Sequence, residues 1–136
     1  MIVLDTNIVL DAYVFNDPAT LTLKTALAAQ QRQWIATPAM RDELERVLGY
    51  PKIVLRLAVN QITAAEVLAQ FDGQTLLHEV APKAPVTCTD PDDQKFIDLA
   101  VAHKAMLLSK DNAVLCMSKR LLALDVRAQA AINFVA

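Results

Sequence analysis

Four acidic side chains, spread along the sequence, have the type and setting that metal-dependent chemistry requires: Asp5, Glu43, Asp93 and Asp111. If they meet in a partly desolvated cleft, their mutual repulsion raises some of their pKa values or demands a cation. No basic residue is expected among them. Oxygen ligands of high charge suit Mg²⁺ or Mn²⁺, which also bind substrate phosphate. Because such ions activate water and neutralise a leaving oxygen, the cluster predicts phosphoryl transfer, with nuclease activity as its natural form.

Two of these acids follow predicted strands. Asp5 comes directly after the apolar run 2–4, and Asp111 comes just after the run 105–109. The ligand crevice of an open parallel sheet lies outside the carboxyl ends of its strands, so the two acids can share a site if their strands are neighbours. An alternative stays open, because Asp is common after strands and each acid could be only a turn or cap residue.

Asp93 lies in the first turn of a predicted helix over 91–103, in an acidic segment that also holds Asp90 and Asp92. Asp90 and Asp92 are expected only to cap the helix and to face the positive end of its dipole. Asp93 precedes Ile97 by four residues and so shares the apolar, sheet-facing side of the helix, where an acid needs a partner. Asp98 is turned about 140° away from Asp93 and is expected to be a solvated flanking charge.

Glu43 lies on the flank of the apolar stripe of a second predicted helix, three residues after Met40 and four before Val47. Glu45 points further towards solvent. Glutamates on an exposed helix flank are commonly solvated, and this alternative also stays open for Glu43.

Strands and helices alternate along the chain. The expected strands are 2–4, 34–36, 75–80, 105–109 and 121–126. The expected helices are 20–33, one after the Thr37 cap that Gly49 stops, 52–59, 63–71 ended by Gly73, 91–103, 112–119 and a terminal one over 129–134. This order predicts an α/β fold, a three-layer α/β/α sandwich with a central, mostly parallel sheet of four or five strands.

Composition limits the classes of protein that this chain can be. Its 136 residues suit one domain over 1–136, and a hydrophobic fraction of 54% excludes a disordered chain. The net charge is −2, so nucleic acid can bind only through a local patch of basic residues. Glycine occurs only at 49 and 73, which excludes a phosphate-cradling glycine loop and a serine nucleophile elbow.

The remaining chemically reactive residues do not form a recognisable motif. Cys88 and Cys116 lack metal-ligand spacing and are expected to be reduced and buried. His78 is expected in a strand and His103 at the C-terminus of a helix, both without a catalytic partner. The sequence begins without a signal-peptide pattern and has no run long enough to cross a bilayer, so no membrane partner and a reducing, cytoplasmic setting are expected.

Four segments in order resemble the PIN domain family: Asp5-Thr-Asn7, the helix around Glu43, Asp90-Pro-Asp-Asp93, and Leu-Leu-Ser-Lys-Asp111. The match in order and spacing extends over nearly the whole chain. Gly49-Tyr-Pro-Lys52 and Asp-Pro-Asp-Asp resemble the VapC-like branch of toxin components of bacterial toxin–antitoxin pairs. The segment 125–130 lacks the proline that this branch often has, which affects the C-terminal edge and not the site.

The resemblance implies a metal-dependent ribonuclease that cuts single-stranded RNA. On it, the acidic quartet of the family corresponds to the four acids named above. Asn7 corresponds to the polar residue beside the first acid, and Ser109 to the small hydroxyl residue that orients that acid. The resemblance also implies a cognate antitoxin protein as partner and a homodimer as oligomeric state. The apolar stripes of 55–67 leave surface for both contacts.

RNA must be held by a few local residues. Lys110 is closest in sequence to the predicted site, and Tyr13 and Phe15 could stack on bases, although both also suit the core. Further candidates for phosphate contacts, each of which is also typical of solvated surface, are Arg41, Arg46, Lys52, Arg56, Lys83 and Lys95.

Two other functions remain compatible with the sequence. One is a catalytically weak or inactive PIN module that binds metal or nucleic acid without turnover. The other is a haloacid-dehalogenase-like phosphatase, which also begins from an acid after the first strand. That chemistry needs a second acid two residues later, where this chain has Asn7.

Overall fold

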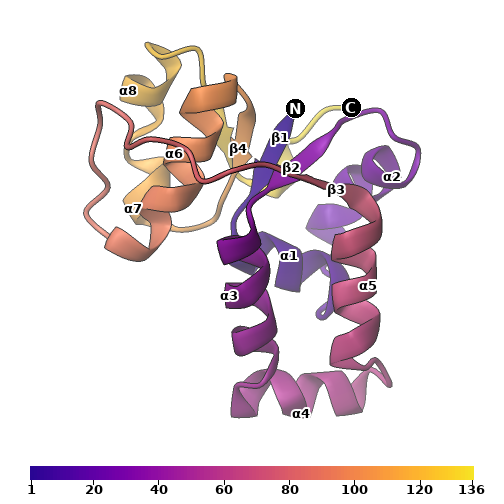
Figure 1. The fold of residues 1–136 in the computed structure, drawn as a ribbon. Helices are drawn as coiled ribbons and strands as arrows, with labels where there is room; N and C mark the ends of the chain where they lie inside the picture. Colours follow the sequence, from indigo (N-terminus) through magenta and orange to yellow (C-terminus); the bar gives the residue numbers. More distant parts are fainter.

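The computed structural model describes residues 1–136, and its centre is a parallel sheet of five short strands. They are β1 (Ile2–Leu4), β2 (Trp34–Ala36), β3 (Thr75–Leu77), β4 (Met106–Leu108) and β5 (Ala128–Gln129), in the order β3-β2-β1-β4-β5. Every pair is parallel, and β1 lies in the middle between β2 and β4 (Figure 1). The predicted α/β fold with a parallel sheet is confirmed.

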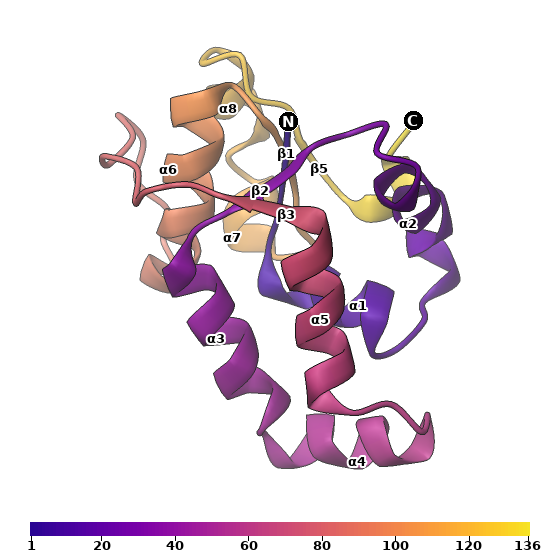
Figure 2. The ribbon, with the colours of Figure 1, turned by 45° about the vertical axis from the view of Figure 1, so that its right-hand side comes forward.

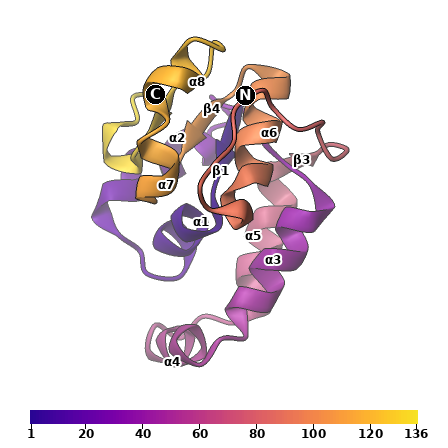
Figure 3. The same cartoon turned by 90° about the vertical axis from the view of Figure 1, so that its left-hand side faces the viewer.

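Helices cover both faces of this sheet. They are α1 (Thr6–Tyr13), α2 (Leu21–Ala28), α3 (Pro38–Leu48), α4 (Pro51–Val59), α5 (Ala64–Gln74), α6 (Gln94–His103), α7 (Asn112–Leu115) and α8 (Ser118–Leu122). Short 3-10 turns occupy Pro18–Thr20, Pro91–Asp93 and Ala131–Asn133. Figure 3 shows α6 on one side of β1 and α7 with α8 on the other. Figures 1 and 2 show α3 and α5 extending together from the sheet, with α4 joining their far ends.

The apolar runs of the sequence become one continuous core of 35 buried residues. All three residues of β1 and of β2 are buried, as expected for strands covered on both faces. Trp34 is 1% exposed and packs edge-on against Phe71, with ring centroids 5.2 Å apart, so it joins the sheet to α5. No helix has the length and apolar character needed to cross a bilayer.

The helix α1 was not predicted. Asp5 begins it, because its carboxylate accepts a hydrogen bond from the backbone N–H of Ile8 at 3.0 Å. The five residues from Ile8 to Ala12 are all buried, so this helix has no polar stripe and its sequence does not show the usual amphipathic period. A helix buried on most sides is difficult to distinguish from an apolar strand and the loop after it.

Several predicted boundaries were wrong. The helix expected over 20–33 ends at Ala28, and Gln30 then adopts a left-handed conformation with φ of 57°. The helix α5 continues through Gly73 to Gln74. The stretch 121–126, expected as a strand, begins inside α8, and the last strand lies at 128–129 instead. The expected terminal helix is only a 3-10 turn.

Cys116 is exposed, which corrects the expectation that both thiols are buried; Cys88 is buried, and both are free.

Candidate metal centre

Neighbouring strands bring Asp5 and Asp111 to the same edge of the sheet. Strands β1 and β4 are paired from Ile2 with Met106 to Leu4 with Leu108, and the backbone N–H of Asp5 donates to the carbonyl of Leu108 at 3.1 Å. Each acid also caps the helix that follows it, since the Asp111 carboxylate accepts from the N–H of Ala113 at 3.0 Å. We call this place, where β1 and β4 end, the acidic edge. Each acid can therefore cap its helix and still belong to the acidic edge.

Ser109 joins the two acids directly. It is fully buried, its hydroxyl donates a hydrogen bond to Asp5 Oδ2, and the same Oγ accepts from the backbone N–H of Asp111 at 3.1 Å. With Ile8 N–H on Oδ1, both oxygens of the 3% exposed Asp5 carboxylate are held in place. The orientation of Asp5 is therefore set before any ligand arrives.

The start of α6 adds Asp93 and Asp90 to this edge. Asp90, Asp93 and Asp111 each offer a carboxylate oxygen within 4.8 Å of the others. Asp90 caps its turn as expected, accepting from the N–H of Asp92 at 2.9 Å, and its carboxylate also lies beside those of Asp93 and Asp111. The three-residue spacing of Asp90 and Asp93 could have indicated this from the sequence, because a turn brings residues i and i+3 to the same side.

Burial and mutual repulsion perturb the acids. Burial, more than any other cause, raises the pKa of Asp93 from 3.8 to about 7, and a hydrogen bond to Asp111 and the charge of that acid add to this. The same hydrogen bond lowers the pKa of Asp111. Burial also raises the pKa of Asp5, against the opposing hydrogen bonds from Ser109 and Ile8. Without a cation, Asp93 and Asp111 are thus most stable sharing one proton.

The donor set fits a hard divalent cation. Every ligand atom that the cluster offers is a carboxylate oxygen. Asp93 Oδ2 is buried and has no hydrogen-bond partner, which is costly for a carboxylate unless something positive binds it. Mg²⁺ and Mn²⁺ both satisfy these requirements, and the cluster does not distinguish them.

Glu43 lies at the same cleft but has different partners. It projects from α3, where its Oε1 accepts from the Thr6 hydroxyl at 3.0 Å and its Oε2 forms an ion pair with Lys95 of α6. The expectation that no basic residue lies among the acids was therefore wrong. Sequence alone gave no clear signal, because a lysine in the first turn of α6 is typical of solvated surface.

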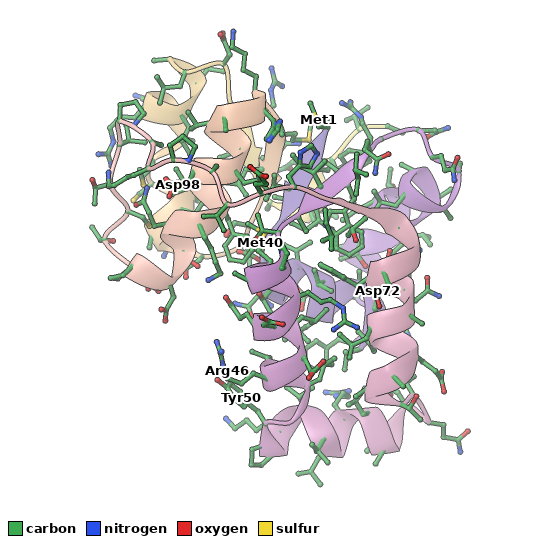
Figure 4. The ribbon with its side chains drawn as sticks, viewed as in Figure 1. Met1, Met40, Arg46, Tyr50, Asp72 and Asp98 are labelled. Atoms are coloured by element: carbon green, nitrogen blue, oxygen red, sulfur yellow. The ribbon has the colours of Figure 1, made fainter.

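The cleft has an acidic end and an apolar wall. Its volume is about 600 Å³, and Asp5, Glu43 and Asp93 line one end together with the exposed Asn7. Figure 4 shows Tyr50 at the far end, where α3 meets α4. The other lining residues are Thr6, Leu10, Val47, Tyr50, Pro51, Lys52, Ile53 and Phe96.

Several residues proposed for RNA contact have other partners. Lys110 pairs with the buried Asp11 at 3.0 Å. Arg41 is held by Asp72 of α5 at 2.7 Å, and Figure 4 shows Asp72 on that helix. The Tyr13 hydroxyl donates to Gln74 at 3.1 Å, so Tyr13 packs against the core rather than lining the acidic cleft.

Three further expectations concern residues outside the acidic edge. Asp98 on α6 (Figure 4) was expected to be solvated, but it accepts from the N–H of Ala84 at 2.9 Å and from the Gln94 side chain at 2.8 Å. It therefore anchors the loop that precedes Asp90. His103 ends α6 as predicted. His78, which was expected in a strand, instead follows β3, and its ring lies 4.4 Å from that of His103, centroid to centroid.

Sequence comparison agrees with this architecture. A family model described as the PIN domain matches residues 1–113, which include the three acids that line the cleft and the neighbouring Asp90 and Asp111. A search of curated proteins found no match. The matched region covers most of the chain and carries four of the five strands in their parallel order. The chain therefore belongs to the PIN domain family, whose members are generally nucleases.

Proposed function

We propose that this chain is a metal-dependent endoribonuclease that cleaves phosphodiester bonds of single-stranded RNA, with Mg²⁺ or Mn²⁺ as its cofactor. The observation that carries the proposal is the group of Asp90, Asp93 and Asp111 at one edge, joined to Asp5 through Ser109, with a buried Asp93 oxygen that has no partner. A nuclease needs such a concentration of negative charge because a divalent ion must be held against a phosphate that is itself negative.

The residues of the centre have separable roles in this proposal. Asp5, Asp93 and Asp111 would hold the ion, with Asp90 within reach of the last two. When bound, the metal would supply the positive charge that activates water and neutralises the leaving oxygen. Ser109 orients Asp5 through its hydrogen bond. Glu43 and the exposed Asn7 would face the substrate from the cleft.

Substrate binding must rely on a few cations, because the net charge of the chain is −2. Lys52 is exposed and lines the cleft, so it is the best-placed candidate for a phosphate contact. Lys110 is a weaker candidate because it pairs with Asp11. The apolar wall at the Tyr50 end can accept a base face or ribose beside the cut phosphate.

We further propose that the chain is the toxin of a toxin–antitoxin pair, working with a cognate antitoxin protein and as a homodimer. The support is the resemblance of Gly49-Tyr-Pro-Lys52 and Asp90-Pro-Asp-Asp93 to that branch of the family. Large apolar side chains exposed on α4, including Leu55 at 68% and Val59 at 74%, offer surface for either partner.

Cleavage of a fluorescently labelled single-stranded RNA tests the proposal. We expect cleavage with Mn²⁺ or Mg²⁺, none with EDTA, and at least a hundredfold loss in Asp5→Asn. Asp92→Asn is the matched control, because Asp92 is exposed and lies outside the group of three acids. Thermal stabilisation by Mn²⁺ without cleavage would instead indicate a metal-binding module that has no turnover.

A further inference from the structure

The side chain of Lys95 is held firmly beside the proposed centre. It lies in the first turn of α6, where its ammonium forms an ion pair with Glu43 of α3 and a hydrogen bond with the carbonyl oxygen of Asp92. It also lies over the Phe96 ring, 4.8 Å from the centroid. The Lys95 side chain is 29% exposed and that of Glu43 is 18% exposed, so solvent screens this pair less than an open surface pair.

Because of this lysine, the negative charge of Glu43 is compensated and that of Asp93 is not. Both oxygens of Glu43 already have partners, since Thr6 donates to one and Lys95 binds the other. By contrast, Asp93 Oδ2 has no partner, and Asp93 and Asp111 offer carboxylate oxygens within 4.8 Å of each other. Glu43 also lies outside the group of Asp90, Asp93 and Asp111, whose carboxylate oxygens lie within 4.8 Å of one another. The uncompensated negative charge is therefore on the side of Asp93 and Asp111, away from Glu43.

A second divalent ion between Glu43 and Asp93 would have to displace the Lys95 ammonium or lie beside it. Displacement breaks a partly buried ion pair, and coexistence places like charges within a few ångströms of each other. A lysine can occupy the position of a cation beside Glu43, because its ammonium is a compact point charge on a flexible stem.

We propose that Lys95 takes the place of a second divalent cation, so that this centre binds one ion, at Asp93 and Asp111 beside Asp5, while Lys95 neutralises and positions Glu43. The inference rests on the proposed function, because it assumes that the acidic edge binds a metal. It makes Lys95 a positioning residue and determines the metal stoichiometry of this chain.

Isothermal titration with Mn²⁺ in the absence of RNA tests this inference. We expect one Mn²⁺ per chain in the unmodified protein and two in Lys95→Gln, with the second site lost again in the double variant Lys95→Gln, Glu43→Gln. Lys95→Arg should keep one, because it keeps the positive charge. Lys119→Gln, which removes an exposed lysine of α8 that lines a separate depression, should also keep one.

The outcomes separate the two proposals. Two Mn²⁺ ions in the unmodified protein, or one in a Lys95→Gln variant whose circular dichroism is unchanged, would overturn the role of Lys95 and leave the proposed nuclease intact. No Mn²⁺ binding in the unmodified protein would overturn the proposed function itself. If Lys95→Gln does not fold, a second ion in Lys95→Arg would still overturn the inference, because the charge has been retained.

Discussion

Asp93→Asn tests the electrostatic account of the acidic edge without relying on activity. Burial raises the pKa of Asp93 from 3.8 to about 7, so the folded state binds a proton that the unfolded chain releases near pH 4. A raised pKa in the folded state means that this stabilisation is complete below pH 4 and is lost as the pH rises to about 7. Asparagine cannot ionise, yet its amide can still donate to Asp111, so the variant should lack this loss.

The size of the effect follows from the pKa. A rise from 3.8 to about 7 corresponds to about 4 kcal/mol at 1.36 kcal/mol per pKa unit. Because the carboxyl is only partly buried, we halve this for solvent screening, to about 2 kcal/mol. Without metal, the stability of Asp93→Asn relative to the unmodified protein should therefore increase by about 2 kcal/mol between pH 4 and pH 8. That is about 8 °C in Tm for a chain of this size.

Urea unfolding at a series of pH values, with EDTA present, measures this difference. Asp92→Asn is the control and should follow the unmodified protein, because its side chain is exposed. Saturating Mn²⁺ at pH 8 should reverse the order, since an ion at one hundred times its Kd adds about 2.7 kcal/mol to the protein that binds it. A stability difference that stays constant or shrinks as the pH rises would refute the reasoning.

Two further substitutions separate structural roles from functional ones. Ser109→Ala removes the buried hydroxyl that holds Asp5, so we expect the free energy of unfolding to fall by about 1–2 kcal/mol and Mn²⁺ affinity to fall with it, measured by urea unfolding and titration calorimetry. If stability falls and Mn²⁺ affinity does not, Ser109 is only structural. Lys110→Ala leaves the buried Asp11 unpaired and should lower the free energy of unfolding by about 1–2 kcal/mol. Lys52→Ala should instead weaken RNA binding and lower the slope of log affinity against log salt concentration by about one. The reverse pattern would show that the RNA contact had been assigned to the wrong lysine.

The sequence predicts the acidic edge better than it predicts the elements around it. Asp5 and Asp111 follow short runs of apolar residues, and such runs in a parallel sheet end at one edge. What the sequence could not supply was the adjacency of β1 and β4, which depends on how the chain crosses over the sheet. Helical periodicity predicted Asp93 on the sheet-facing side of a helix, whereas Asp93 ends a 3-10 turn and is the N-cap of α6.

The errors have identifiable physical causes. Helix α1 is buried on most sides and shows no polar stripe, so periodicity does not reveal it. At the C-terminal end, Asp125 adopts a left-handed conformation with φ of 64°, which delays the last strand to Ala128. Lys95 and Glu43 are 52 residues apart in the sequence, and only the packing of α3 beside α6 brings them together. Contacts of this kind depend on tertiary structure, and one sequence does not contain a local signal for them.

A crystal structure with Mn²⁺ tests the central claim most directly. The account predicts one anomalous peak within coordination distance of carboxylate oxygens of Asp93 and Asp111, beside Asp5, with Lys95 still bound to Glu43. Asp93→Asn crystals treated in the same way should lack it. An ion bound elsewhere, or an acidic edge that stays free of Mn²⁺ at saturating concentration, would contradict the account.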